Sequence, residues 1–264
     1  MKMGILKLAA AAFLALGVSG AAWAETLNVG AYAANPPWEM KNTSGGFEGF
    51  EVDVINEIGK RLGMEVAIQD LGFQALFAAT SSKRIDAAIS SITITDERLG
   101  SQSFTQGYYD ADLALASNKE SGIKSMADMK GKVAAVLSSS TGEIWAKANQ
   151  EKMGFSEVRG YNTQQDMVLD TQNGRADGAI SDITGLEFGF KQMPQMQVVE
   201  RIPSGDKYAI MMGKDHPMLG KVNDAISEMK KDGTMLTLYK KWFGDTSEPG
   251  PSTTTPLDLP MKAG

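Results

Sequence analysis

Apolar and polar positions change their period several times along the chain. Around Val29 they alternate as in a strand, and further on apolar residues recur on one stripe, as in a helix. The expected elements are strands over 26–31, 64–69 and 86–91 and helices over 51–62 and 73–82. Strands and helices that alternate in this way are typical of a parallel sheet with helices on both faces, and the alternation returns after Lys132.

Two ten-residue segments, 84–93 and 175–184, are nearly the same. Seven of the ten positions are identical (RIDAAISSIT and RADGAISDIT) at an offset of 91, and each copy follows an amphipathic helix that ends in a polar turn. Two copies of one helix–strand unit predict two α/β lobes of similar build, because a solenoid needs more repeats than two. Chance likeness between two short buried strands is the alternative.

Both ends of the chain differ from the middle. Two lysines precede an apolar run over 8–18, and Ala22-Trp23-Ala24 has the small-x-small form of a cleavage site. The run is too short for a membrane-spanning helix, so we expect a cleaved signal peptide over 1–24 and a periplasmic protein. No Cys follows the cleavage site, so we expect no lipid anchor.

Residues 247–264 are rich in Pro, Thr and Ser, which predicts a flexible tail.

Composition excludes several classes of function. The chain of 264 residues has no Cys and one His, which excludes a disulfide scaffold, a thiolate metal site, a cysteine nucleophile and any site with two imidazoles. A net charge of −6 argues against a nucleic-acid partner, which would require a basic face. We therefore expect no metal, no cofactor and no nucleic acid, and we expect a monomer.

Polar residues follow both copies of the repeated strand. In an open α/β sheet, ligands bind beyond the carboxyl ends of the strands. The repeat places Ser90, Ser91 and Thr93 at that end in one lobe and Asp182 in the other. One wall then offers hydroxyl and N–H groups and the other a carboxylate, so we expect the function to lie between them.

Five segments carry a resemblance to a known family. They are 49–54 (GFEVDV), 92–98 (ITITDER), the strand and turn over 132–141, 174–177 (GRAD) and 231–244 (KDGT to KKWFG). In this order they resemble the polar amino-acid receptors of ABC importers, solute-binding protein family 3, from about residue 26 to 244. The resemblance implies a non-enzymatic receptor that closes on one amino acid and docks to an inner-membrane ABC permease complex.

The same resemblance implies a two-lobed periplasmic-binding-protein fold, with two α/β lobes joined by two hinge strands. The expected boundaries are 25–111 and 208–246 for the first lobe and 112–207 for the second, with crossings near 110–113 and 205–210. The chain would leave the first lobe, build the second and return.

By this resemblance Arg98, helped by Ser91 and Thr93, takes the ligand's α-carboxylate, and Asp182 takes its α-amine. The chemistry agrees, because a guanidinium pairs with a carboxylate through two charge-assisted hydrogen bonds. A surface ion pair of Arg98 with a neighbouring acid, or an Asp182 that only caps a helix, is the alternative.

Further ligand contacts are expected from both lobes. Ser140 and Thr141 begin a helix over 142–150, whose free N–H groups suit an anion, although the pair could be a cap and no more. Phe73 matches a position that stacks on the ligand in the family, with a place in the core as the alternative.

The chain departs from the family beside its Pro-Pro step. Many members have an aromatic residue where this chain has Asn35, and receptors for basic amino acids have an Asp where it has Tyr32. This argues against lysine or arginine as the ligand unless Glu39 or Glu143 holds the cation. We expect Tyr32, Asn35 and Trp38 to form a wall suited to a neutral polar or modified amino acid.

An enzyme on the same scaffold is the second hypothesis. Some secreted relatives are cyclohexadienyl (arogenate or prephenate) dehydratases, which use a cleft glutamate as general acid about three residues after the Asp182 position. Gly185 stands there in this chain, and the nearest acid is Glu187.

Overall fold

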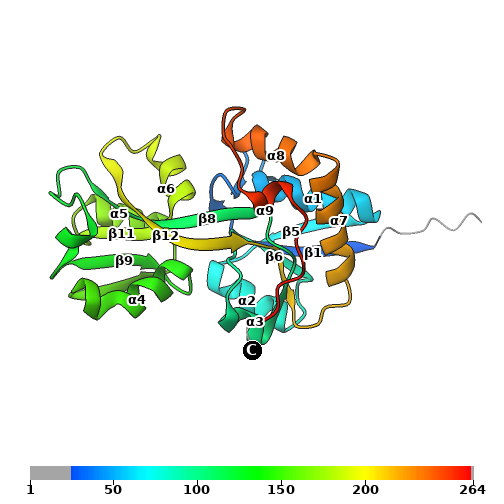
Figure 1. Ribbon diagram of the computed structural model, residues 1–264, viewed down its shortest axis with the longest axis horizontal. Helices are drawn as coiled ribbons and strands as arrows, with labels where there is room; N and C mark the ends of the chain where they lie inside the picture. Colours follow the sequence, from blue (N-terminus) through cyan, green and yellow to red (C-terminus); the bar gives the residue numbers. More distant parts are fainter. Residues whose placement is uncertain (1–24, 263–264) are drawn as a thin grey trace, which may run out of the picture.

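The computed structural model describes residues 25–262, so the expected signal peptide lies outside the described residues. Two five-stranded sheets lie side by side along the long axis of the molecule (Figure 1). The first has the order β5-β1-β6-β13-β7 and the second the order β10-β9-β11-β8-β12. Their strands are β1 (Thr26–Ala31), β5 (Glu65–Asp70), β6 (Ala87–Ile89), β7 (Gln102–Phe104), β8 (Tyr109–Asn118), β9 (Val133–Leu137), β10 (Glu157–Tyr161), β11 (Gly178–Asp182), β12 (Met196–Tyr208) and β13 (Met211–Gly213).

Helices cover the sheets of both lobes. The first lobe carries α1 (Phe50–Leu62), α2 (Phe73–Ser81), α3 (Asp96–Ser101), α7 (Leu219–Lys231), α8 (Thr234–Phe243) and α9 (Pro251–Thr254). The second carries the short 3-10 helix η1 (Met126–Met129) with α4 (Thr141–Met153), α5 (Gln164–Gln172) and α6 (Ile183–Phe190). A small sheet of β2 (Ala34–Asn35), β3 (Glu39–Lys41) and β4 (Phe47–Glu48) precedes α1.

The expected parallel core is present in both lobes. Strand β1 lies parallel to β5 and β6, and β9 lies parallel to β10 and β11. Alternate side chains of the first sheet face opposite helix layers: Val29 and Ile89 pack with α1 and α7, whereas Ala88 and Met211 pack with α2. The alternation in the sequence therefore places one sheet between two helix layers, as expected.

Two long antiparallel strands, β8 and β12, connect the lobes (Figure 1). The chain leaves the first sheet after β7, enters the second lobe along β8 and returns along β12 to β13. Of the expected crossings, 110–113 lies on β8, and 205–210 runs from the last residues of β12 into the link to β13. Their register shifts twice, between Val198 and Glu200 and between Ile202 and Asp206.

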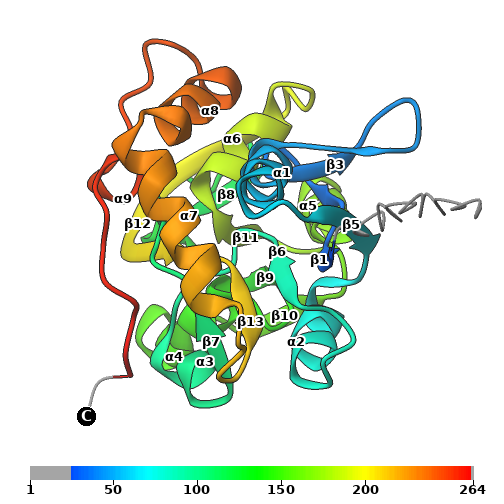
Figure 2. The same cartoon turned by 90° about the vertical axis from the view of Figure 1, so that its right-hand side faces the viewer.

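The expectation of a flexible tail is wrong for residues 247–262. Figure 2 shows this segment passing along α7, and its helix α9 contains the buried Ser252 and Thr253. Hydrogen bonds to the first lobe, rather than apolar side chains, hold this segment in place. The Ser252 backbone N–H and hydroxyl donate to the two oxygens of Asp110 (2.8 and 2.6 Å), and Lys230 Nζ donates to the carbonyl of Thr255 (3.2 Å).

Candidate functional site

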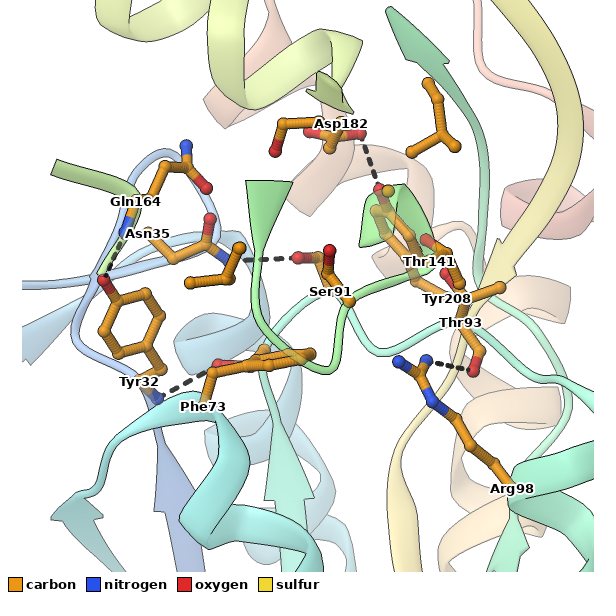
Figure 3. Close-up of a pocket in the computed structure, with 16 residues that line it drawn as sticks. Tyr32, Asn35, Phe73, Ser91, Thr93, Arg98, Thr141, Gln164, Asp182 and Tyr208 are labelled. Atoms are coloured by element: carbon orange, nitrogen blue, oxygen red, sulfur yellow. Dashed lines mark hydrogen bonds between the residues drawn. The ribbon is translucent and has the colours of Figure 1, made fainter. Parts of the chain in front are cut away.

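A cleft between the lobes brings together the carboxyl ends of β6, β9 and β11 (Figure 3). Its lining includes ten of the eleven residues that the sequence predicts: Tyr32, Asn35, Phe73, Ser90, Ser91, Thr93, Arg98, Ser140, Thr141 and Asp182. Six further residues complete it: Leu113, Leu137, Gly142, Gln164, Ser181 and Tyr208.

Arg98 is a buried cation on the first-lobe side of the cleft. Thr95 caps the short helix α3 by accepting from the Arg98 backbone N–H (3.2 Å), which fixes the base of the side chain. Nη1 donates to the Thr93 carbonyl (2.8 Å), and Nη2 donates to the carbonyl of Ser139 in the second lobe (2.9 Å). Burial lowers the pKa of Arg98 to about 10, so it stays charged at neutral pH. The alternative of a solvated helix residue is therefore excluded.

Asp206 of β12 is an acid that the sequence reasoning missed. The hydroxyls of Thr93 and Thr141, one from each lobe, both hydrogen-bond to its Oδ2 (3.2 and 3.0 Å). Burial raises the pKa of Asp206, and the two hydroxyls and Arg98 oppose that rise. Because both hydroxyls serve Asp206, the groups left for an anion at this end are the guanidinium of Arg98 and the first backbone N–H groups of α4.

Asp182 is the anion of the opposite wall, and it is also a helix cap. Its Oδ1 accepts from the backbone N–H of Gly185 (2.6 Å) at the start of α6, and its Oδ2 accepts from the hydroxyl of Tyr208 (2.6 Å). Burial raises its pKa to about 6, against the lowering effect of these donors. Capping and facing the cleft are compatible, because one carboxylate accepts several hydrogen bonds.

Polar groups of both lobes meet at the other end of the cleft from Arg98 (Figure 3). The backbone N–H of Gln164 donates to the Tyr32 hydroxyl (3.1 Å), and the Asn35 amide donates to the Ser91 hydroxyl (3.0 Å). The Phe73 ring is buried and also lines the cleft. A ligand in this cleft would therefore lie between Arg98 at one end and neutral polar groups at the other.

Trp38 is the predicted residue that does not line the cleft. It is fully buried, and its ring packs against Phe50, Tyr109, Tyr208 and Phe243. Its Nε1 lies 3.4 Å from Asp182 Oδ1, so it supports the site from behind. A large apolar ring surrounded by four others stays in the core, and the expected wall consists of Tyr32 and Asn35 without it.

Of the missed residues, Gln164 had a usable signal. Gln164 begins α5 as Phe73 begins α2, and the two residues are separated by the same offset of 91 that relates the repeated segments. The repeat therefore makes Gln164 the counterpart of Phe73 in the second lobe. Tyr208 and Asp206 had no such signal, because they come from the strand that returns between the lobes.

Comparison with known proteins gives the family. The sequence profile of the bacterial extracellular solute-binding proteins, family 3, matches residues 27–245. The chain belongs to this family.

Relatives within family 3 carry names of amino-acid-binding proteins. An L-arginine-binding protein of Pseudomonas aeruginosa is 32% identical over 228 residues, covering 82% of this chain and 87% of that protein. A lysine/arginine/ornithine-binding periplasmic protein of Escherichia coli is 33% identical over 254 residues, covering 92% and 97%. Among solved structures, an ancestral arginine-binding protein bound to arginine matches with a TM-score of 0.78 at 34% identity, covering 83% of this chain and 98% of that one.

These relatives are named as binding proteins and not as enzymes, and the dehydratase hypothesis has no support among them. The position expected for the dehydratase acid is occupied by Gly185, whose backbone N–H donates a hydrogen bond to Asp182 Oδ1. Among residues 25–262, no helix is long and apolar enough to cross a membrane.

Proposed function

We propose that this family 3 protein is the receptor of an amino-acid importer, which closes its lobes on one free amino acid and presents it to a membrane permease of the ABC type. The observation that carries the proposal is the placement of opposite charges on the two walls of one cleft. Arg98 faces it from the first lobe and Asp182 from the second, which suits the carboxylate and ammonium groups of an α-amino acid. The relatives' names support the same class of ligand.

The carboxylate would lie at the Arg98 end. Of the five N–H donors of a guanidinium, two serve the Thr93 and Ser139 carbonyls, so others remain for the ligand. The backbone N–H groups that begin α4 at Thr141 and Gly142 add donors from the second lobe. Each hydrogen bond to a charged group is worth about 1.5–3 kcal/mol, so a few of them are compatible with micromolar binding, near about −8 kcal/mol.

Closure would occur about the strands β8 and β12. Polar contacts already cross between the lobes, including Arg98 to the Ser139 carbonyl and the Gln164 N–H to Tyr32. A ligand that touches both walls gains its contacts only when the lobes are together, so it shifts the population towards the closed state. We place the protein in the periplasm as a monomer, exported by residues 1–24 as a cleaved signal peptide.

A thermal-shift screen of residues 25–264 against the amino acids, opines and arogenate tests this function. A ligand at one hundred times its dissociation constant adds about 2.7 kcal/mol to the free energy of unfolding, which raises the melting temperature measurably. We expect one class of amino acid to do so without any product being formed. Turnover of arogenate, or no shift with a sample that releases no small molecule on denaturation, would contradict the proposal.

A further inference from the structure

Two glutamates lie against each other beneath the first-lobe wall of the cleft. Glu39 of β3 and Glu51 in the first turn of α1 are both fully buried, and neither forms an ion pair within residues 25–262. Gly49 allows this approach, because a Cβ there would lie 2.1 Å from the Trp38 carbonyl oxygen and its φ is 141°. The start of α1 therefore packs directly on the backbone of β3.

The hydrogen-bond partners of the two carboxyl groups differ, and the difference indicates which of them carries a proton. Both oxygens of Glu51 accept: Oε1 from the Tyr108 hydroxyl (2.6 Å) and Oε2 from the Ser91 N–H (2.8 Å). Its place in the first turn of α1 also favours the ionised form. Glu39 differs, because Oε1 accepts from Asn35 and Ser90 while the buried Oε2 has no donor among residues 25–262. The side chains of Glu39 and Glu51 lie within hydrogen-bond reach of each other, so a proton on that Oε2, donated to Glu51, satisfies every polar atom of the pair.

The surrounding charges favour the same assignment. Burial, followed by the charge of Glu51, raises the pKa of Glu39 well above its ordinary value. The other titratable groups that act on the pair are Asp182 across the cleft, Tyr108 beside Glu51 and Tyr32 beside Glu39. None of these is a cation, so only hydrogen bonds and the first turn of α1 oppose the cost of ionising both carboxyls.

The pair fixes the orientation of Asn35 in the cleft. The register of β2 and β3 sets Asn35 opposite Glu39, and its amide nitrogen donates to Glu39 Oε1 (3.0 Å) and to the Ser91 hydroxyl (3.0 Å). Both amide hydrogens are then used, so Oδ1 is the group left for a ligand. Turning the amide over would set Oδ1 against an oxygen that already accepts from the Ser90 hydroxyl (2.6 Å).

We propose that Glu39 is a protonated positioning residue that holds the Asn35 carbonyl oxygen towards the ligand, so that the cleft selects an amino acid whose side chain donates a hydrogen bond. The selection rests on the proposed function; the protonation of Glu39 does not. Asn35, Tyr32 and Gln164 lie at the end of the cleft away from Arg98, where a ligand side chain would reach (Figure 3). Glutamine, citrulline and arginine therefore bind in preference to glutamate and norleucine, which offer no donor there.

The first arm of the test needs no ligand. Carboxyl ¹³C spectra of the wild-type protein at pH 8, where Asp182 is ionised, are compared with those of Glu39→Gln and of the matched control Glu48→Gln, an exposed residue of the neighbouring strand β4. We expect one neutral carboxyl signal in the wild-type protein and in Glu48→Gln that disappears in Glu39→Gln. Two ionised carboxylates at positions 39 and 51 would overturn the assignment.

The second arm measures binding of glutamine and its isostere glutamate. We expect the wild-type protein to prefer glutamine by at least about tenfold. Glu39→Gln keeps this preference, because its carbonyl accepts from Asn35 and Ser90 and its amide donates to Glu51. Glu39→Leu loses it, since the Asn35 amide is then free to turn.

Equal discrimination by Glu39→Leu and the wild-type protein would overturn the positioning role. If no amino acid binds at all, the proposed function and the selectivity fail together, and the first arm still decides whether Glu39 holds the proton. If Glu39→Leu does not fold, the contrast between glutamine and glutamate in Glu39→Gln tests the selectivity by itself: no preference there overturns it.

Discussion

The two copies of the repeated unit fold alike up to the end of their buried strand and differ after it. Helices α2 and α5 begin and end at the same offset of 91, and the turns that follow have a positive φ at Lys83 (58°) and Gly174 (73°). Next, Asp86 and Asp177 each accept the backbone N–H of the neighbouring parallel strand, at 2.8 Å in both lobes. These features build the scaffold, and both lobes use them.

The strands then continue differently. In the first lobe the chain turns through Ser91, whose φ is 45°, and reaches Arg98 in α3. In the second lobe Asp182 is itself the cap of α6. The same unit therefore ends in a cation on one wall and an anion on the other. A repeated scaffold with unlike ends is suited to a ligand that has unlike ends, such as an α-amino acid.

Removing either charge is expected to give the largest effect. Arg98→Ala or Asp182→Asn should each weaken amino-acid binding by at least about a hundredfold, because each loses charge-assisted hydrogen bonds worth about 1.5–3 kcal/mol apiece. Titration calorimetry measures the affinity, and thermal unfolding checks that the variants fold. Arg84→Ala, at the exposed start of the first copy, is the control. If either cleft variant binds within threefold of the wild-type affinity, the substituted residue does not bind the ligand group assigned to it.

Acid should weaken binding through one wall only. Because Asp182 has a pKa raised to about 6, it becomes protonated below that pH and cannot pair with an ammonium group. Affinity should fall by up to about tenfold per pH unit between pH 6 and 4, and Asp182→Asn should show no such dependence. An affinity that stays flat in the wild-type protein over this range would rule out Asp182 as the ammonium partner.

The stability of the ligand-free protein should change in the opposite sense. A folded-state pKa above the unfolded value means that the native state binds the proton more tightly. The contribution of Asp182 is then fully present below the unfolded pKa, near about 4, and is lost as the pH rises through about 6. Comparison of unfolding by urea in the wild-type protein and in Asp182→Asn at pH 4 and pH 7 isolates the contribution of Asp182 to the free energy of unfolding.

The shared part of the repeat should give equal losses in the two lobes. Asp86→Ala and Asp177→Ala each leave a strand N–H without its acceptor, which costs about 1–2 kcal/mol of unfolding free energy. Urea unfolding measures the cost, and amino-acid affinity should stay unchanged. A loss in one lobe and none in the other would mean that the copies are alike in sequence but not in energetics.

The smallest effect is expected in the turn that faces Arg98. Ser139 has a φ of 67°, which a side chain disfavours, while its carbonyl accepts from Arg98. Ser139→Gly should raise the free energy of unfolding by at most about 1 kcal/mol, since relief of strain is partly offset by the greater freedom of glycine in the unfolded chain. A clear loss of stability would show that the Ser139 side chain has a role of its own.

The fold was predictable where it depends on local pattern. The alternation around Val29, the helical stripe that ends at Gly63 and the repeated segments all correspond to observed elements. The C-terminal segment was not predictable, because its partners Asp110 and Lys230 are distant in the sequence and its order depends on hydrogen bonds to them.

The site was predictable to the same extent. Asp182 and the hydroxyls of Ser91 and Thr93 could be found from strand ends, whereas Arg98 followed from the resemblance to family 3. Trp38 could not be placed correctly, because only the tertiary packing shows the aromatic cluster around it. The role of Asp206 could not be predicted, because its hydrogen bonds to one threonine of each lobe depend on the path of β12 between the lobes.

The central claim is that Arg98 holds the carboxylate and Asp182 the ammonium group of one ligand. Calorimetric titration of wild-type protein, Arg98→Ala and Asp182→Asn with glutamine, its α-carboxamide and its α-hydroxy analogue tests this pairing most directly. We predict that the carboxamide binds far more weakly than glutamine to the wild-type protein but about equally to Arg98→Ala, and that the α-hydroxy analogue shows the same pattern with Asp182→Asn. Losses that simply add, with each variant still discriminating as the wild-type protein does, would contradict the claim.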